Sequence, residues 1–576
     1  MSEKALVDTI RSSIIGQDQA VVGPFGPRPV IYADYTASGR ALTFIEDYIA
    51  EVVLPLYANT HTESSGTGLQ TSRLREEARA IIARCVGAGD EHAVLFCGTG
   101  ATGAIAKLVA VLGLRIPSVL EDRHRLSRHI PADQRPVVFV GPFEHHSNEL
   151  PWRESIADVV AIGEDADGHI DLADLEANLQ RFADRPLLIG SFSAASNVTG
   201  ILSDTAAVST LLHRHGALSF WDYAAAGPYV EIDMGRSTAG PEYLDAIFLS
   251  PHKFIGGPGT PGLLVARREL FTNRVPAVPG GGTVSYVNQT DHDYATAIET
   301  REEGGTPDII GSIRAGLVFQ LKAAVGSSEI ERRERLLLRR AIRSWREVPN
   351  IEILGNLEAD RLSILSFVIG DPSDTGGVGQ GSPRRYLHHN FVVAVLNDVF
   401  GIQARGGCSC AGPYGHRLLG IEIERSHRFQ EAVGRGCEGI KPGWVRVNFN
   451  YFIDDETADY IIGAVELVAR HGLSVLPYYR FEPSTGLWTH RDGAVQPPFS
   501  LDNVRYVDGV MVHETPHDAP TSAPPLPGYL ASTGQWLEQL ARERPLPIGP
   551  PDPGDDFEAL RWFPYPADVK TGKATS

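Results

Sequence analysis

Short apolar runs alternate with amphipathic stretches between about residues 90 and 270 of the chain. The amphipathic stretches carry apolar residues every three or four positions and predict helices over 102–114, 172–182 and 206–215. Strands and helices that alternate in this way form right-handed crossovers around a mostly parallel sheet. Such a sheet is covered on both faces, which explains why the apolar runs lack polar alternation. The pattern predicts an α/β domain with strands at A-V-L-F (93–96), V-V-F-V (137–140), L-L-I-G-S-F (187–192), L-S-F-W-D (218–222), A-I-F-L-S (246–250) and G-L-L-V-A (262–266).

A second region with a different pattern follows after about residue 325. Residues 329–345 have the periodicity of an amphipathic helix, and 364–369 and 444–449 are apolar strands, which together predict a smaller α+β domain. The glycine-rich residues 370–383 have the composition of a flexible loop. The proline-rich C-terminal extension, residues 476–576, has no assigned role. It could cover a dimer, shape the entrance to a site, dock a partner protein, or only pack against the rest of the protein. The expected organisation is an N-terminal segment 1–30, a large domain 31–325, a small C-terminal domain 326–475 and an extension 476–576.

Composition and charge limit the partners of the protein. The 576-residue chain is 43% hydrophobic, enough to bury a large core. Its formal net charge of −19 argues against binding to nucleic acid or to anionic membranes, because both need a basic surface. The N-terminus lacks a signal-peptide pattern, and no run approaches about 18 apolar residues. We therefore expect a cytoplasmic protein with small-molecule or protein partners and with its five cysteines reduced.

Glycines and polar side chains follow the predicted strands of the large domain. Ligands of open α/β sheets bind at the carboxyl ends of strands, so these residues should converge on one site. The glycine turn at 97–103 precedes a helix whose free N–H groups suit a phosphate, although such turns are also common without a ligand. It lacks the Lys-Ser/Thr of a nucleotide-binding P-loop. The segments are C-G-T-G-A-T-G (97–103), E-H-H-S-N (144–148), S-A-A-S-N (193–197), D-Y-A-A-A-G (222–227) and S-P-H-K (250–253).

Three kinds of side chain in these segments could carry chemistry. Asp222 ends an apolar strand and is either a helix cap or a carboxylate paired with a cation. His145 or His146 could stack on an aromatic ligand, but an isolated histidine is more often structural. Lys253 ends a buried strand, where desolvation would favour a neutral, nucleophilic amine, whereas a surface lysine there would be unremarkable.

A phosphate cradle, an aspartate, a histidine and an amine on one sheet edge are the groups that a pyridoxal 5′-phosphate site needs. Here the sequence resembles the class V aminotransferase family of fold-type I enzymes that use this cofactor, and within it the cysteine desulfurases and selenocysteine lyases. The resemblance spans roughly residues 30 to 470, and its motifs occur in the family's order. They are Y-A-D-Y-T-A-S (32–38), G-T-G-A (98–101), F-E-H-H-S-N-E-L-P-W (143–152), S-N-V-T-G (196–200), W-D-Y-A-A-A (221–226), S-P-H-K (250–253), G-G-G (280–282) and R-E-E-G-G-T-P (301–307).

The resemblance implies a role for each matching residue of the large domain. Lys253 is the expected lysine that bonds the cofactor aldehyde, Asp222 the partner of the pyridine nitrogen, and His145 the ring that stacks on the cofactor. Ala225 stands where the family commonly has Gln or His, so the contact to the phenolic oxygen is in question and could fall to Asn197 or water. Thr306 matches a threonine that reaches the phosphate of the other subunit, which implies a homodimer. The remaining phosphate ligands implied are Thr99, Gly100, Ala101, Ser250 and His252.

A second informative stretch, G-I-Q-A-R-G-G-C-S-C-A-G-P-Y-G, covers residues 401–415. Cysteine desulfurases with a compact loop carry an arginine, a glycine two residues later and a nucleophilic cysteine five residues later, which Arg405, Gly407 and Cys410 reproduce. The Cys-Ser-Cys spacing also resembles molybdenum cofactor sulfurases. By the same resemblance, Arg446 binds the substrate carboxylate and Arg405 supports it.

The residues themselves support a reactive Cys410. A loop flanked by glycines exposes the thiol, and a nearby arginine favours the thiolate. The competing interpretations are half of a metal site or small residues in a tight turn, and metal is disfavoured because no second Cys/His cluster has zinc spacing.

The resulting hypothesis is an enzyme that removes sulfur or selenium from cysteine or selenocysteine. The reaction would leave a persulfide on Cys410 and release alanine, and a protein could accept the sulfur. Alternatives are a transaminase, epimerase or lyase acting on another amino acid, a molybdenum cofactor sulfurase-like transferase, or a scaffold without activity.

Overall fold

The computed structural model describes most of the chain as two compact units. The first unit comprises 1–14, 35–335 and 358–362, and the second comprises 15–34, 336–357 and 363–576. Residues 15–34 thus lie with the C-terminal half of the chain, and the predicted loop 370–383 falls almost entirely outside the described residues. The described residues are 3–60, 62–235, 240–371, 385–493, 497, 499–514, 525–543, 549 and 554–569.

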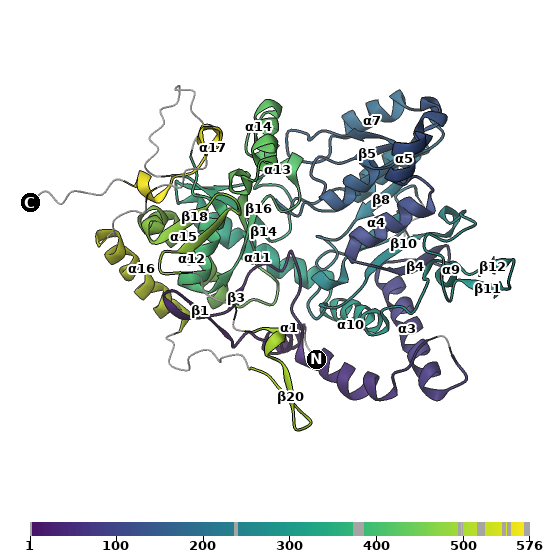
Figure 1. Ribbon diagram of the computed structural model, residues 1–576, viewed down its shortest axis with the longest axis horizontal. Coiled ribbons are helices and arrows are strands. Elements are labelled where there is room, and N and C mark those ends of the chain that lie inside the picture. Colours follow the sequence, from purple (N-terminus) through teal and green to yellow (C-terminus); the bar gives the residue numbers. More distant parts are fainter. Residues whose placement is uncertain are drawn as a thin grey trace, which may run out of the picture. The chain divides into compact units, whose positions relative to one another are not determined.

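A seven-stranded sheet forms the centre of the first unit (Figure 1). Its strands pair in parallel from β9 to β6, while β10 runs antiparallel to both neighbours. The sheet confirms the predicted, mostly parallel α/β fold. Six of its strands are buried along nearly their whole length because helices cover them, while the edge strand β6 is partly exposed. In spatial order the strands are β4 (His92–Cys97), β10 (Gly262–Arg267), β9 (Ala246–Leu249), β8 (Leu218–Asp222), β7 (Leu188–Ser193), β5 (Val137–Val140) and β6 (Asp158–Ala161).

The three helices predicted in this region are present. They are α4 (Gly100–Val111), α7 (Leu172–Arg181) and α8 (Thr205–Arg214). Two longer helices, α3 (Gly66–Cys85) and α10 (Ile309–Val325), pack so closely that a side chain at Gly316 would meet Ala78. The unit also contains α1 (Glu3–Ser12), α2 (Thr43–Tyr48), α5 (Ser118–His124), α6 (Leu150–Arg153), α9 (Ile298–Glu302), β11 (Val284–Val287) and β12 (His292–Tyr294).

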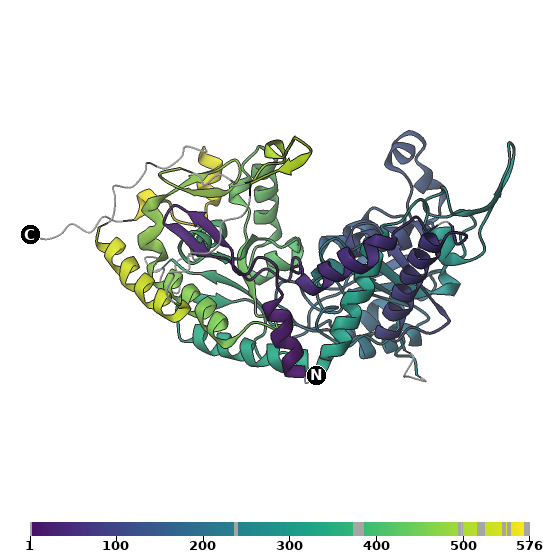
Figure 2. The same ribbon diagram turned by 90° about the horizontal axis from the view of Figure 1, so that it is seen from below.

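A four-stranded antiparallel sheet organises the second unit. Helices α11 (Ser327–Arg346), whose first half belongs to the first unit, α12 (His389–Phe400) and α15 (Asp455–Val475) contribute to the same core as the sheet (Figure 2). In spatial order the strands are β13 (Ile351–Ile353), β14 (Ile364–Ile369), β17 (Trp444–Asn448) and β16 (Arg405–Gly407). Smaller elements are β1 (Ala20–Gly23), β2 (Gly26–Pro29), β3 (Ile31–Tyr32), β15 (Ile402–Gln403), α13 (Gly412–Leu418) and α14 (Ile423–Gly434).

The C-terminal extension contributes large aromatic side chains to the core of the second unit. Trp488, Phe563 and Tyr565 are buried there, and the ring of Phe563 meets that of His388 edge-on at 4.6 Å. Burial of such rings is a major source of stability, so the extension is part of the unit's fold. Its elements are β18 (Tyr479–Glu482), β19 (Leu487–His490), β20 (Arg505–Val507), β21 (Val510–Val512), α16 (Leu526–Arg542) and α17 (Asp555–Leu560).

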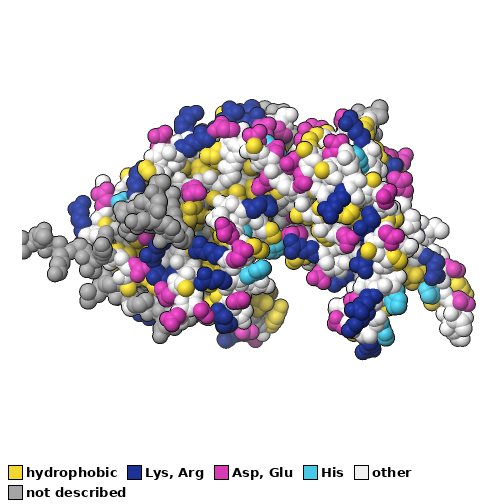
Figure 3. Space-filling view, turned by 90° about the horizontal axis from the view of Figure 1, so that it is seen from above, with side chains coloured by type: hydrophobic (Ala, Val, Ile, Leu, Met, Phe, Trp, Pro, Cys, Tyr) yellow, Lys and Arg dark blue, Asp and Glu magenta, His cyan; other side chains and the backbone are white. Residues whose placement is uncertain are grey.

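The surface mixes charges of both signs, and Figure 3 shows acidic and basic side chains interspersed over the face in view. Within the described ranges, no single helix is both long and apolar enough to cross a membrane. The helices α10 and α11, which are bent by 74° at their junction, together have the length and composition of a span, and nothing else in the described residues indicates one. Across the same ranges, no group of three or more His, Cys, Asp or Glu residues could hold a metal ion.

Candidate active site

The turn between β4 and α4 forms a small cradle with the segment that follows β9. Gly100 begins α4 with a φ of 55°, a conformation that favours glycine. The backbone N–H of Ala101 donates a hydrogen bond of 2.9 Å to Ser250 Oγ. A Cβ at position 100 would lie 2.8 Å from Ser250 Oγ and 3.6 Å from His252 Nε2. Three of the predicted phosphate ligands and the N-terminus of a helix therefore surround a space that only glycine leaves open.

A strand on the other side of the turn holds the cradle in place. The N–H of Gly262, the first residue of β10, donates to Gly98 O at 3.1 Å. A Cβ at Gly262 would lie 1.9 Å from Gly100 O, so the two backbones can approach this closely only without a side chain. The close pairing of β10 with β4 fixes the turn that carries Thr99.

Asp222 and Lys253 lie at the carboxyl ends of the adjacent parallel strands β8 and β9. Asp222 is 4% exposed and accepts a hydrogen bond of 2.7 Å from the N–H of Ala224. Burial raises the pKa of Asp222, while this hydrogen bond and the positive charge of Lys253 oppose the rise. Lys253 ends a short 3₁₀ turn, Pro251–Lys253, directly after β9. Asp222 thus has both the local backbone hydrogen bond expected of a capping residue and the charge of Lys253 within electrostatic reach.

His252 is neutral at physiological pH in this setting. Burial lowers the pKa of its imidazole to about 4, and the charge of Lys253 adds to the effect. A neutral imidazole has one N–H donor and one acceptor nitrogen, so it can donate to a phosphate oxygen without itself being charged.

A buried glutamate that sequence analysis passed over lies beside the predicted histidine. Glu144 accepts hydrogen bonds from Asn148 Nδ2 at 2.6 Å and from the backbone N–H and Oγ of Ser193 at 2.9 and 2.6 Å. Burial raises the pKa of Glu144 to about 7, the three donors oppose this, and the negative charge of Asp222 adds to the rise. The signal was its position, four residues after the end of β5 and directly before the two histidines of the E-H-H sequence.

Two further predicted residues lie near this end of the sheet. His145 is half-buried, and its Nδ1 accepts a hydrogen bond of 3.1 Å from the N–H of Ser147. Asn197 follows β7 and is 7% exposed. Ala225, which replaces a polar residue of the family, is 8% exposed, in the turn after Asp222.

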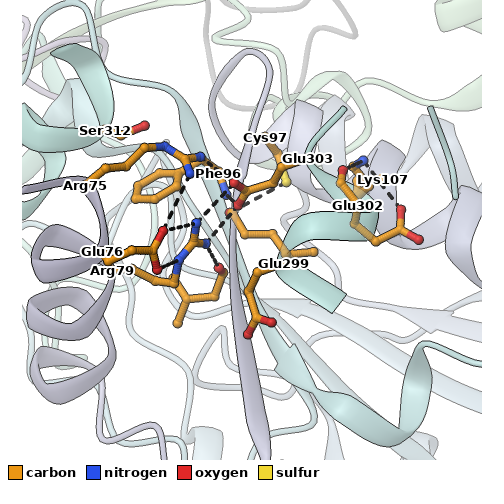
Figure 4. A network of polar contacts seen from close by, with 12 residues as sticks. Arg75, Glu76, Arg79, Phe96, Cys97, Lys107, Glu299, Glu302, Glu303 and Ser312 are labelled. Atoms are coloured by element: carbon orange, nitrogen blue, oxygen red, sulfur yellow. Dashed lines mark hydrogen bonds and ion pairs between the residues drawn. The ribbon is translucent and has the colours of Figure 1, made fainter. Parts of the chain in front are cut away.

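The segment carrying Thr306 is fixed by two buried glutamates (Figure 4). Glu303 accepts hydrogen bonds from Arg75, from Arg79 at 2.8 and 3.1 Å, and from the N–H of Phe96 at 2.8 Å. Glu302 accepts from Asn273 Nδ2 at 2.7 Å and from a backbone N–H at 3.1 Å.

Thr306 itself is exposed and accepts a hydrogen bond of 3.3 Å from Asn59 Nδ2. Sequence analysis identified the R-E-E-G-G-T-P motif but not the anchoring role of its two glutamates, because their partners lie far away along the chain.

Cys410 lies in a tight turn of the second unit, between β16 and α13. Ser409 and Cys410 both adopt left-handed backbone conformations, with φ of 50° and 55°, which are uncommon for residues other than glycine. The N–H of Ala411 donates to Cys408 O at 3.0 Å and closes the turn. Cys410 is exposed, whereas Cys408 is half-buried, and both are free thiols. The turn thus presents the side chain of Cys410 to solvent.

The two predicted substrate arginines share one carboxylate. Arg405 and Arg446 face each other across β16 and β17. Arg405 Nε donates to Asp34 Oδ2 at 2.9 Å, and Arg446 Nη2 donates to Asp34 Oδ1 at 3.0 Å. Asp34 belongs to the Y-A-D-Y-T-A-S motif, but sequence analysis gave it no role. The predicted cofactor residues thus lie in the first unit, and the two predicted substrate arginines lie in the second.

Comparisons with known proteins decide the family. The profile of the family described as aminotransferase class-V matches residues 31–429. The chain belongs to the class V aminotransferases. Among curated members, a probable cysteine desulfurase of Streptomyces coelicolor is 26% identical over 62% of this chain and 83% of its own length. The cysteine desulfurase of Dickeya dadantii is 26% identical over 71% of this chain and 88% of its own length.

Two solved cysteine desulfurase structures share the fold of this chain. The apo cysteine desulfurase from Thermococcus onnurineus NA1 superimposes with a TM-score of 0.60 at 24% identity, covering 77% of this chain and 95% of that one. A cysteine desulfurase from Escherichia coli gives a TM-score of 0.59 at 21% identity, covering 80% and 97%. These likenesses confirm the predicted fold type.

Proposed function

We propose that this class V aminotransferase is a pyridoxal 5′-phosphate-dependent cysteine desulfurase. The cradle at Gly100 fits a phosphate, because it brings a helix N-terminus, the hydroxyl of Ser250 and a neutral His252 together where a side chain at position 100 would be too close. The buried Asp222 beside Lys253 fits the pyridine nitrogen and the aldehyde of the cofactor. When bound, the cofactor supplies an electron sink next to the substrate's α-carbon.

The residues of the first unit then have distinct tasks. Lys253 Nζ would hold the cofactor aldehyde and, as a free amine, would take the α-proton of the substrate and later return a proton. The Asp222 carboxylate would pair with the ring nitrogen of the cofactor and favour its protonated form, and His145 would contact the ring. The phosphate would be held by Thr99, Gly100, Ala101, Ser250 and His252, and Asn197 would be available to the phenolic oxygen.

The residues of the second unit select and attack the substrate. Arg446 and Arg405 bind the substrate carboxylate through charge-assisted hydrogen bonds. The Sγ of Cys410, as thiolate, attacks the substrate sulfur. A sulfur–sulfur bond forms while the bond between that sulfur and the substrate β-carbon breaks. The electron pair stays on the β-carbon, which takes up a proton and becomes the methyl group of alanine. The persulfide on Cys410 is then available to an acceptor protein.

The observation that favours a desulfurase over a transaminase is the exposed Cys410 on a left-handed turn. The decisive measurement is release of sulfide and alanine from L-cysteine under a reductant, with Cys410→Ala compared with Cys408→Ala. We expect Cys410→Ala to lose at least about 100-fold of sulfide release while cofactor absorbance is retained, and Cys408→Ala to stay within about threefold of wild type. Unchanged turnover in Cys410→Ala would remove this residue from the mechanism, and amino transfer from several donors to a keto acid would indicate a transaminase.

We further propose a homodimer in which Thr306 completes the phosphate site of the partner subunit. Supporting this, Thr306 is exposed in the single chain although its segment is held by two buried glutamates. The nearby segment before Asn59 also exposes apolar side chains, with Val52, Leu56 and Tyr57 each 45 to 51% accessible. Analytical ultracentrifugation should give twice the chain mass. Selenocysteine as an alternative substrate and a cytoplasmic location stay predictions.

A further inference from the structure

Asp34 is the common partner of two arginines in the second unit. Its Oδ2 accepts from Arg405 Nε at 2.9 Å, and its Oδ1 accepts from Arg446 Nη2 at 3.0 Å. The three side chains differ in exposure: Arg446 is 4% exposed, Asp34 is 12% exposed and Arg405 is 47% exposed. One end of the cluster is therefore buried while the other remains accessible to a ligand.

The backbone fixes Asp34 from both sides. β3 pairs in parallel with β15, with Tyr32 opposite Gln403. Ala33 donates its N–H to Gln403 O at 3.0 Å, and its carbonyl accepts from the N–H of Asn448 at 3.1 Å. Asp34 follows directly, so two main-chain hydrogen bonds of Ala33, to segments that adjoin the two arginines, fix the position of its backbone.

The register of the sheet explains why a carboxylate is needed there. Arg405 and Arg446 are direct partners on the antiparallel strands β16 and β17, so their side chains leave the same face of the sheet. Like charges directly opposite repel and would drive the more exposed Arg405 toward solvent. One carboxylate that contacts both guanidinium groups removes this repulsion and holds them together. Because an arginine has five N–H donors, each contact with Asp34 uses only part of the binding capacity.

We propose that Asp34 is a positioning residue that holds Arg405 and Arg446 as one carboxylate-binding pair. The inference rests on the proposed function, which assigns the two arginines to the substrate carboxylate. Two guanidinium groups and one carboxylate sum to a single positive charge, which complements the single negative charge of a substrate α-carboxylate. Asp34 therefore acts on substrate affinity through the arginines and takes no part in bond breaking.

Binding to the holoenzyme without turnover tests this proposal. Isothermal titration calorimetry with L-alanine and with ethylamine, which is alanine without its carboxylate, measures recognition of that group alone. We expect wild type to prefer L-alanine by tenfold or more. Asp34→Asn keeps the shape of the side chain but removes its charge, and it should weaken L-alanine binding about tenfold while leaving ethylamine within twofold. Equal weakening of both ligands, or none for L-alanine, would overturn the proposal.

Further variants separate positioning from general damage. In an Arg405→Gln background, the pair of guanidinium groups that Asp34 holds together no longer exists. Adding Asp34→Asn should therefore change L-alanine affinity by less than threefold. Full multiplication of the two separate effects would contradict the proposal. Glu438→Gln, which removes a surface ion pair with Lys441 in the same unit, should leave binding unchanged.

If Asp34→Asn does not fold, Asp34→Glu retains the charge and should keep the tenfold preference for L-alanine; loss of that preference would overturn the proposal. Because no turnover is needed, a failure to release sulfide from cysteine counts against the desulfurase proposal alone. Unaltered alanine binding in Asp34→Asn counts against the role of Asp34 alone.

Discussion

Replacing Glu303 by Gln should destabilise the first unit severely, because this carboxylate compensates two buried cations. The side chain of Glu303 is 6% exposed, and those of Arg75 and Arg79 are 9% and 11% exposed. Burial alone would raise the pKa of Glu303, but the charges and hydrogen bonds of Arg79 and Arg75 reverse the effect and leave it below its usual value. The Glu303→Gln variant would preserve the shape of the side chain and leave both guanidinium groups with the exposed Glu76 as their remaining ionic partner.

The size of the effect follows from the burial of the cluster. Removing one partner of a buried ion pair typically costs about 3–5 kcal/mol, because the remaining charge stays desolvated. An unfolding entropy of about 2 cal/mol/K per residue over a unit of roughly 320 residues gives about 0.7 kcal/mol/K, so a loss of about 4 kcal/mol lowers Tm by about 6 °C. The backbone N–H of Phe96, which donates to Glu303, should also exchange with solvent faster.

Thermal unfolding followed by circular dichroism, combined with hydrogen exchange of the Phe96 amide, measures both effects. Glu299→Gln is the matched control, because Glu299 lies on the neighbouring helix α9 and pairs with Arg268 at 2.6 Å near the surface. That change should cost less than about 1 kcal/mol and lower Tm by less than about 2 °C. A Tm of Glu303→Gln within about 2 °C of wild type, or an equal loss in the control, would refute the reasoning.

Three further changes test the site. Gly100→Ala places a Cβ 2.8 Å from Ser250 Oγ at a positive φ, so spectrophotometric titration should show cofactor affinity reduced about tenfold or more. Lys253→Ala should leave no borohydride-fixed cofactor peptide in protein supplied with pyridoxal 5′-phosphate, and a labelled peptide elsewhere would contradict the assignment. Because burial raises the pKa of Glu144 from about 4.5 to about 7, the folded state holds this proton more tightly than the unfolded state. Its contribution to stability is complete below about pH 4.5 and is lost as pH rises to about 7, a change of roughly 3 kcal/mol. The free energy of unfolding measured with denaturant should therefore fall with rising pH over this range in wild type and not in Glu144→Gln.

Local patterns predicted most of the first unit because its elements are defined by contiguous residues. Continuous apolar runs indicated β4, β5, β7, β8, β9 and β10, and the 3.6-residue period indicated α4, α7 and α8. β6 (Asp158–Ala161) escaped because it is an edge strand with partly exposed residues and no long apolar run. The antiparallel direction of β10 could not be predicted either, because a buried strand has the same composition in a parallel and in an antiparallel pairing.

Long-range partners could not be predicted from the sequence. Glu303 and Arg75 are 228 residues apart, and Asp34 and Arg446 are 412 residues apart. No local pattern indicates which cation a carboxylate will meet when the intervening chain folds. The extension was unassigned for the same reason, because the burial of Phe563 depends on partners such as His388 far along the chain.

Exposure separates two clusters that are otherwise built alike. In each unit one carboxylate from a distant segment contacts two arginines: Glu303 with Arg75 and Arg79, and Asp34 with Arg405 and Arg446. All three side chains of the Glu303 cluster are at most 11% exposed, so it can only hold the fold together. Arg405 in the Asp34 cluster is 47% exposed and lies five residues before the exposed Cys410. The same ion-pair arrangement therefore contributes to stability where all its side chains are buried, and to ligand binding where one arginine is exposed to solvent. For this reason, loss of Glu303 should lower Tm, and loss of Asp34 should weaken substrate binding.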